Sequence, residues 1–98
     1  MIIFVDIDDT IFKSSGLEYD KSEPIFERIE KINKLYDDGN EIIYWTARGT
    51  KTGKNWFELT YNQLKNAGCK FTELRMGKPY YDLFIDDKNI NSEIFFNK

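Results

Sequence analysis

Histidine is absent from this 98-residue sequence, and cysteine occurs only once, at Cys69. The lack of histidine removes the commonest general base, the commonest zinc ligand and every catalytic triad that depends on an imidazole. A single cysteine leaves no disulfide within the chain, which predicts a reducing, cytoplasmic setting and a simple packing role for Cys69. Aspartate, glutamate and lysine are therefore the candidate catalytic groups.

Long apolar runs and a strong basic charge are also missing. The apolar runs reach only the length of a strand, and the N-terminus has no basic segment followed by a signal core, so we expect neither a membrane partner nor export. A net charge of -3 argues against a nucleic-acid partner. With 41% hydrophobic and 16% aromatic residues, the composition predicts one packed domain over residues 1–98.

Strand-like runs alternate with helical periodicity along the chain. The predicted strands are Ile2–Val5, Glu41–Trp45 and residues 82–85, with a weaker candidate at residues 70–74. One helix is predicted from an N-cap at Ser22 to a glycine cap at Gly39, and a second over residues 56–67, before Gly68. The second helix is expected to face inward through Phe57, Tyr61, Leu64 and Ala67. Residues 11–20 read as a small flap, and residues 88–98 as a short closing element.

This alternation predicts an α/β fold with a mostly parallel sheet, whose ligands bind outside the carboxyl ends of the strands. One connection is short for this prediction. Only residues 75–81 separate the last two strand candidates, whereas a parallel crossover usually needs about a dozen residues or more. The weak strand at residues 70–74 could therefore lie outside the main sheet.

Acidic residues follow two of the predicted strands. Asp6, Asp8 and Asp9 come directly after the first strand, and Asp86 and Asp87 come directly after residues 82–85. Carboxylates that converge at one sheet edge repel one another unless a divalent cation neutralises them or one of them stays protonated. A magnesium site shared by Asp6 and Asp86 is the simplest resolution, and the enzymatic interpretation depends on that convergence.

The order of these residues resembles that of the haloacid dehalogenase (HAD) superfamily. The likeness rests on Asp6-x-Asp8-x-Thr10 after a strand, Thr46 ending a second strand, Lys78 in Gly-Lys-Pro, and a late acidic pair. The resemblance implies a three-layer, Rossmann-like catalytic domain with helices on both faces of the sheet. The gaps between the motifs are only 35 and 31 residues long, which leaves no room for a cap domain.

The resemblance also implies roles for individual residues. Asp6 would be the nucleophile that forms an aspartyl-phosphate, and Asp8 the acid and base in the two half-reactions. Thr46 and Lys78 would hold the phosphate. Magnesium would be bound by Asp6, Asp8 and Asp86, with Asp87 acting through water. These roles make chemical sense because an anionic nucleophile needs positive charge before it can approach an anionic phosphate.

Arg48, two residues after Thr46, is a candidate contact to the leaving group or to a second phosphate, with a surface salt bridge as the alternative. The segments 45–49 and 77–88 are similar to those of small HAD proteins associated with surface-polysaccharide synthesis, which implies a sugar phosphate as substrate. An open site also suits an exposed phosphate on a larger substrate, or a small one enclosed by the flap or by a homo-oligomer partner.

The sequence therefore predicts a magnesium-dependent phosphatase acting on a phosphomonoester. Transfer of the phosphoryl group to an alcohol instead of water stays open. Two alternatives lack turnover: a receiver-like module, which the order of the acidic residues disfavours, and a degenerate phosphate- and magnesium-binding module.

Overall fold

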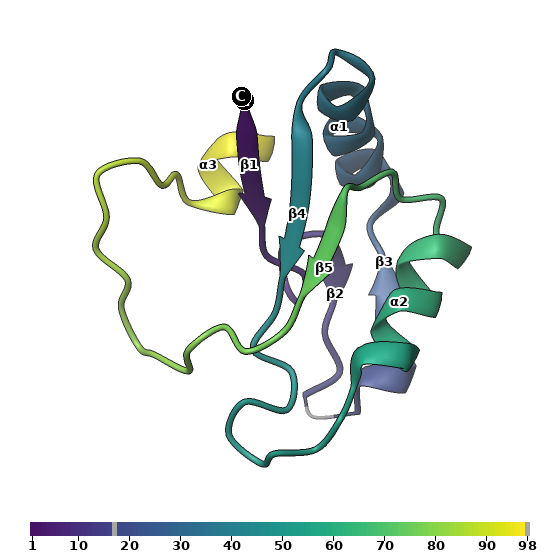
Figure 1. The fold of residues 1–98 in the computed structure, drawn as a ribbon, viewed down its shortest axis with the longest axis vertical. Helices are drawn as coiled ribbons and strands as arrows, with labels where there is room; N and C mark the ends of the chain where they lie inside the picture. The colour runs from purple at the N-terminus through teal and green to yellow at the C-terminus, as the bar shows by residue number, and fades with distance from the viewer. Residues whose placement is uncertain (17, 98) are drawn as a thin grey trace.

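Three parallel strands form the main sheet in the order β1-β4-β5 in the computed structural model, which describes residues 1–16 and 18–97 (Figure 1). β1 (Ile2–Val5) pairs with β4 (Glu41–Trp45), and β4 pairs with β5 (Glu73–Arg75). The first two strands match their predicted bounds. The weak candidate at residues 70–74 is confirmed as a strand of this sheet, shifted toward the C-terminus.

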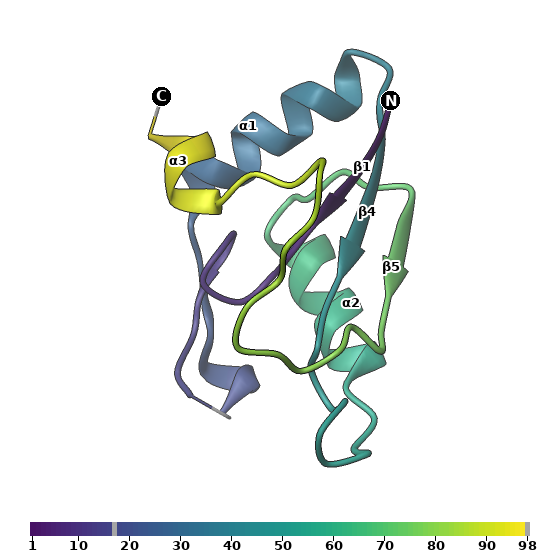
Figure 2. The ribbon, with the colours of Figure 1, turned by 90° about the vertical axis from the view of Figure 1, so that its left-hand side faces the viewer.

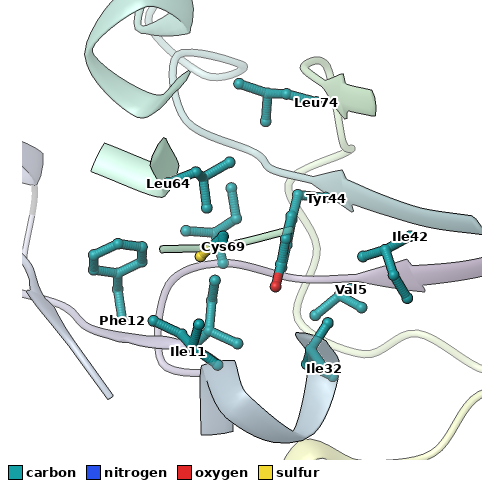
Figure 3. Packing of buried hydrophobic residues seen from close by; sticks show 11 residues of the cluster. Val5, Ile11, Phe12, Ile32, Ile42, Tyr44, Leu64, Cys69 and Leu74 are labelled. Atoms are coloured by element: carbon teal, nitrogen blue, oxygen red, sulfur yellow. The ribbon is translucent and has the colours of Figure 1, made fainter. Parts of the chain in front are cut away.

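The helices α1 (Phe26–Asp37) and α2 (Phe57–Asn66) lie on the same side of this sheet (Figure 1). Parallel register places Val5 level with Tyr44, and Tyr44 level with Leu74. These three buried side chains therefore share the face that meets Ile32 of α1 and Leu64 of α2 (Figure 3). Helices were predicted on both faces of the sheet; the α/β class is confirmed, but the three-layer arrangement is not.

The flap takes the form of a short hairpin. β2 (Phe12–Lys13) pairs antiparallel with β3 (Glu23–Pro24), and the single helical turn η1 (Tyr19–Lys21) lies between them. The predicted helix start at Ser22 is wrong, because α1 begins at Phe26 and has no side-chain cap. Pro24 has no N–H to donate, and proline is tolerated both in the first turn of a helix and in an edge strand. Pro24 is therefore as compatible with β3 as with the predicted helix start.

The inward face of α2 also differs from the prediction. Thr60 and Leu64 are fully buried, whereas Phe57 and Tyr61 are half-exposed and stack on each other with ring centroids 6.0 Å apart. Mutual stacking covers part of each ring without placing either in the core. The glycine cap predicted after this helix is confirmed, since Gly68 adopts a φ of 79°.

Residues 79–91, which we call the arm, contain the clearest error of the sequence analysis. Residues 82–85 were predicted to be a strand of the sheet, yet they form no strand and are exposed. The arm bows away from the sheet in Figure 1 and returns to α3 (Ser92–Phe96), the predicted closing element. Figure 2 shows α3 beside the start of α1, where Glu93 forms an ion pair with Arg28 over 3.0 Å. Both ends of the arm are thus attached to the domain.

No helix in the described part of the chain is long and apolar enough to cross a membrane.

Candidate functional site

Asp6 directly follows β1, at the carboxyl edge of the sheet. Its two carboxylate oxygens have different partners: Thr10 Oγ1 donates a hydrogen bond to Oδ2 over 3.0 Å, and Lys78 Nζ donates to Oδ1 over 3.2 Å. The Asp6 side chain is 36% exposed, so it is accessible from solvent. A carboxylate that is accessible and paired with an ammonium group is well placed to attack an electrophilic phosphorus.

The backbone after Asp6 winds tightly around one carbonyl group. The N–H groups of Thr10 and Ile11 both donate to the carbonyl oxygen of Ile7, over 3.2 and 2.9 Å. The side chains of Ile7 and Ile11 are fully buried and anchor the turn in the core. Asp9 adopts a φ of 60°, and its carboxylate accepts hydrogen bonds from the backbone N–H and hydroxyl of Ser14. Asp9 therefore stabilises the turn and is not directed at the site.

Thr46 and Lys78 lie next to each other at the same sheet edge. The backbone N–H of Lys78 donates to the carbonyl oxygen of Thr46 over 3.0 Å, and Gly77 enables the approach with a φ of 79°. The Thr46 hydroxyl oxygen accepts a hydrogen bond from the N–H of Arg48 over 3.1 Å, and the Thr46 side chain is buried in this structure. Thr50 fixes the other side of Lys78 by donating to its carbonyl oxygen over 2.8 Å.

The ammonium group of Lys78 is held in its charged form. Burial alone would lower the pKa of Lys78, but the negative charge of Asp6, its hydrogen bond and the side chain of Tyr81 outweigh burial and raise the pKa above its ordinary value. Lys78 therefore carries a full positive charge beside Asp6 at neutral pH.

Asp8 forms a two-point ion pair with Arg48. Arg48 Nε donates to Asp8 Oδ2 over 2.9 Å, and Nη2 donates to Oδ1 over 2.8 Å. The Arg48 side chain has no exposed surface, while that of Asp8 is 22% exposed. Both oxygens of Asp8 thus accept hydrogen bonds, and Asp8 has to leave Arg48 before it can donate a proton to another group.

Three further residues hold the guanidinium group of Arg48. Its Nη1 donates to the hydroxyl of Thr60 over 3.1 Å and to the amide oxygen of Gln63 over 2.6 Å. The Tyr19 ring lies over the guanidinium carbon, with its centroid 4.8 Å away. Both predictions for Arg48 are wrong for this structure, because the interior of the protein surrounds its side chain. The ion pair with Asp8 is not at the surface, and the guanidinium group is not open to a leaving group or a second phosphate.

The predicted magnesium ligands do not come together within this structure. Their carboxylate oxygens are the hard donors that magnesium prefers. Residues 1–16 and 18–97 nevertheless contain no group of three or more acidic, cysteine or histidine side chains placed to hold a metal ion. Asp6 and Asp8 are occupied as described above, and Asp86 and Asp87 lie on the exposed arm, where Asp86 accepts a hydrogen bond from the backbone N–H of Lys88. The residues of one chain therefore do not fit a magnesium ion in this arrangement.

A shallow cavity of about 160 Å³ borders the site on the side of the loop after β4, between Trp56 and Gly77. Pockets that enclose a ligand are usually about 300–1,000 Å³. This cavity can take a small part of a ligand but cannot enclose a whole sugar phosphate.

Three residues that contact Arg48, namely Tyr19, Thr60 and Gln63, were not predicted from the sequence. Thr60 and Gln63 were missed because the aromatic residues of α2 were assigned to its inward face. A polar pair three residues apart on a helix, opposite a lone arginine, is the signal that would have found them. The role of Tyr19 depends on the path of the hairpin, for which the sequence carries no comparable signal.

Comparison with known proteins supports the fold alone. No family model and no curated protein matches this chain. The chain is similar in structure to a crystallised target protein from Vibrio cholerae, with a TM-score of 0.89 and 22% sequence identity, over 99% of this chain and 88% of the other. That likeness shows that the two proteins share a fold.

Proposed function

We propose that this protein is a phosphohydrolase that cleaves a phosphomonoester with Asp6 as nucleophile. The observation that supports the proposal most strongly is the pairing of a solvent-accessible Asp6 with the charged Lys78 over 3.2 Å. Thr10 orients Asp6 by donating its hydroxyl proton to the carboxylate, and the ammonium group of Lys78, which has three N–H donors, can donate a hydrogen bond to a phosphoryl oxygen. The group as a whole supplies a nucleophile, a positive charge and hydrogen-bond donors.

The proposed reaction has two steps. An oxygen of Asp6 bonds to phosphorus in line with the leaving group, the ester bond breaks, and the leaving oxygen takes a proton from Asp8. A water molecule then attacks the aspartyl-phosphate and gives a proton back to Asp8, which releases inorganic phosphate and regenerates both carboxyl groups. Lys78 reduces the repulsion between Asp6 and the incoming phosphate in both steps.

Asp8 must exchange partners during this cycle. Its pairing with Arg48 corresponds to an ionised resting state, so Asp8 must leave Arg48 and take up a proton from solvent before it can protonate the leaving oxygen. Arg48 is therefore a positioning residue, since its side chain meets Asp8 and the protein interior.

Magnesium dependence stays part of the proposal, although one chain does not assemble the ligands. As substrate we propose a small sugar phosphate, because segments 45–49 and 77–88 are similar to those of small HAD proteins associated with surface-polysaccharide synthesis. The shallow cavity would leave most of such a ligand accessible to solvent. An exposed phosphate on a larger substrate would suit the same site. We also propose a cytoplasmic setting, since the one cysteine is buried and unpaired.

The test is release of inorganic phosphate from sugar phosphates, nucleotides, phosphopeptides and an aryl phosphate, with magnesium present and again after chelation. We expect turnover by the wild type, loss of turnover in Asp6→Asn, and wild-type rates in the matched control Asp9→Asn. Normal turnover by Asp6→Asn would refute the nucleophile assignment.

The alternative is a phosphate-binding or receiver-like module without turnover, and the pairing of Asp8 with Arg48 favours it. A small phosphoryl donor followed by intact-mass measurement separates the two. A long-lived phosphorylated protein that releases no phosphate would establish the alternative, whereas repeated turnover excludes it.

A further inference from the structure

The arm exposes large apolar side chains that its sequence would place in a core. Leu83 is 75% exposed and Ile85 is 88% exposed, and Phe84 and Ile90 are also exposed. A contiguous exposed set of this kind marks an interaction surface on a stable protein more often than a solvated loop. Both ends of the arm are fixed, at Thr46 through Lys78 and at α1 through α3, so the arm is a loop that projects from an ordered domain.

The sheet offers a matching surface along β1. β1 is an edge strand of the described sheet, and one side of its backbone has no strand partner there. Its side chains Ile2 and Phe4 are exposed as well, on the face away from α1 and α2. An apolar edge strand without a partner is a template for the addition of another strand.

The arm cannot reach this edge within its own chain in the orientation that the site needs. For Asp86 to lie level with Asp6, residues 82–85 must run parallel to β1. Asp82 would then lie about 13 Å from the level of Asp6, toward the start of β1, at about 3.3 Å per residue. It would also lie about 10 Å to the side of β4, two strand spacings away.

These two displacements combine to about 16 Å between Lys78 and Asp82. Four residues span at most about 14 Å when fully extended. Because the backbone of Lys78 is fixed to Thr46, no path through Pro79, Tyr80 and Tyr81 covers this distance. The chain would also have to pass around the sheet, which lengthens the route further.

We propose that two copies of this chain exchange arms, so that residues 82–85 of each copy add as a strand to the free edge of β1 in the other. The exchange brings Asp86 of one copy beside Asp6 of its partner. Each site is then built from two chains and gains the acidic residue that a single chain does not place there. The consequence for the site rests on the proposed function, whereas the exchange itself rests on the exposed arm, the free edge and the short connection.

Symmetry favours this occupant over an unrelated partner. Each chain carries both an arm and a free β1 edge, so in a two-fold symmetric dimer the arm of each copy contacts β1 of the other. A stable dimer needs about 1,200 Å² or more of buried surface. Two arms contribute Leu83, Phe84, Ile85 and Ile90 twice, against Ile2 and Phe4 of each partner.

The first experiment measures molar mass in solution by light scattering after size-exclusion chromatography. We expect a dimer for the wild type and a monomer after eight Gly/Ser residues are inserted between Pro79 and Tyr80, since the longer connection lets the arm reach its own β1. The same insertion between Gly53 and Lys54, in an exposed loop, is the control and should stay dimeric. The double variant Leu83→Asp/Ile85→Asp should also be monomeric, which keeps the test valid if the insertion does not fold. A monomeric wild type, or a dimer that both arm variants leave intact, overturns the exchange.

The second experiment tests complementation between two inactive chains. Asp6→Asn and Asp86→Asn are co-expressed with different tags, and phosphate release is measured on the mixture. In an exchanged dimer one site of each mixed pair regains both wild-type residues, so about a quarter of wild-type activity returns. If each site uses its own arm, no activity returns and the exchange is refuted. An inactive wild type would refute the proposed function instead, while the molar-mass measurement still decides the exchange.

Discussion

The pairing of Asp8 with Arg48 leads to a prediction about stability that does not depend on catalysis. Asp8→Asn keeps the shape of the side chain but removes its charge and turns an amide group toward the guanidinium N–H groups. The Arg48 side chain has no exposed surface, so its charge would remain buried with only the neutral partners Thr60 and Gln63. Removal of one member of a buried ion pair costs about 3–5 kcal/mol.

The cost is reduced here because Asp8 is 22% exposed and water can replace part of its contact. We expect a loss of about 2–4 kcal/mol in the free energy of unfolding. A domain of this size loses about 4–8 °C in Tm for each kcal/mol, which corresponds to a decrease of roughly 8–32 °C. Urea unfolding monitored by circular dichroism measures the free energy, and a thermal scan measures the Tm.

Asp9→Asn is the matched control for this prediction. It makes the same chemical change one residue away, at an exposed carboxylate whose partners are the N–H and hydroxyl of Ser14. Its effect should stay within about 1 kcal/mol. The double variant Asp8→Asn/Arg48→Met should lose less than the sum of the two single variants, because no charge is left buried alone. If Asp8→Asn melted within about 3 °C of Asp9→Asn, the claim that Asp8 neutralises the buried guanidinium would be wrong.

Three further predictions follow from individual residues. Lys78→Met should reduce kcat by roughly 10²–10³-fold on any phosphomonoester that the wild type hydrolyses. Because the folded state raises the pKa of Lys78 above 10.5, the charge of Lys78 stabilises the fold below pH 10.5, and this contribution disappears at higher pH. The difference in Tm between wild type and variant should therefore shrink from pH 9 to pH 12. Burial raises the pKa of Cys69 to about 11, so its thiol should react with a disulfide reagent at pH 8 only after unfolding by urea, and rapid labelling of the native protein would contradict this. Gly49→Ala should destabilise the protein far more than Gly53→Ala in a thermal scan, since both glycines have positive φ but only the Cβ at residue 49 would collide with the backbone carbonyl of Lys54; equal Tm values would show that the loop adapts freely.

The fold was predictable where the local pattern and the tertiary environment agree. The apolar runs at β1 and β4 form strands whose buried side chains, such as Val5 and Tyr44, meet α1 and α2, although Ile2 and Phe4 on the other face of β1 are exposed. The glycines after both helices adopt the conformation that ends them. The run at residues 82–85 has the same local pattern, but its place is decided by the length of the connection before it. Sequence patterns indicate which residues prefer a sheet, whereas the anchoring of Lys78 at Thr46 determines which sheet edge they can reach.

The site was predictable to a similar degree. Asp6 and Thr46 were predictable at one edge of the sheet because each of them follows a predicted strand, whereas the prediction for Lys78 rested on the family resemblance. The true environment of Arg48 was not predictable, since it depends on the rotation of α2 about its own axis and on the path of the hairpin. Rotation of a helix is set by packing over its whole length, and stacked aromatic residues on the outer side obscured that signal here.

The contacts of Tyr19 bear on how Asp8 is held in place. Its ring covers Arg48, and its carbonyl oxygen accepts a hydrogen bond from the Gln63 side chain over 2.7 Å. The β2–β3 hairpin is therefore fastened to α2 through the same groups that orient Asp8. If Asp8 is the general acid, as we propose, a displacement of the hairpin would also remove contacts that hold Arg48 and Asp8 in place.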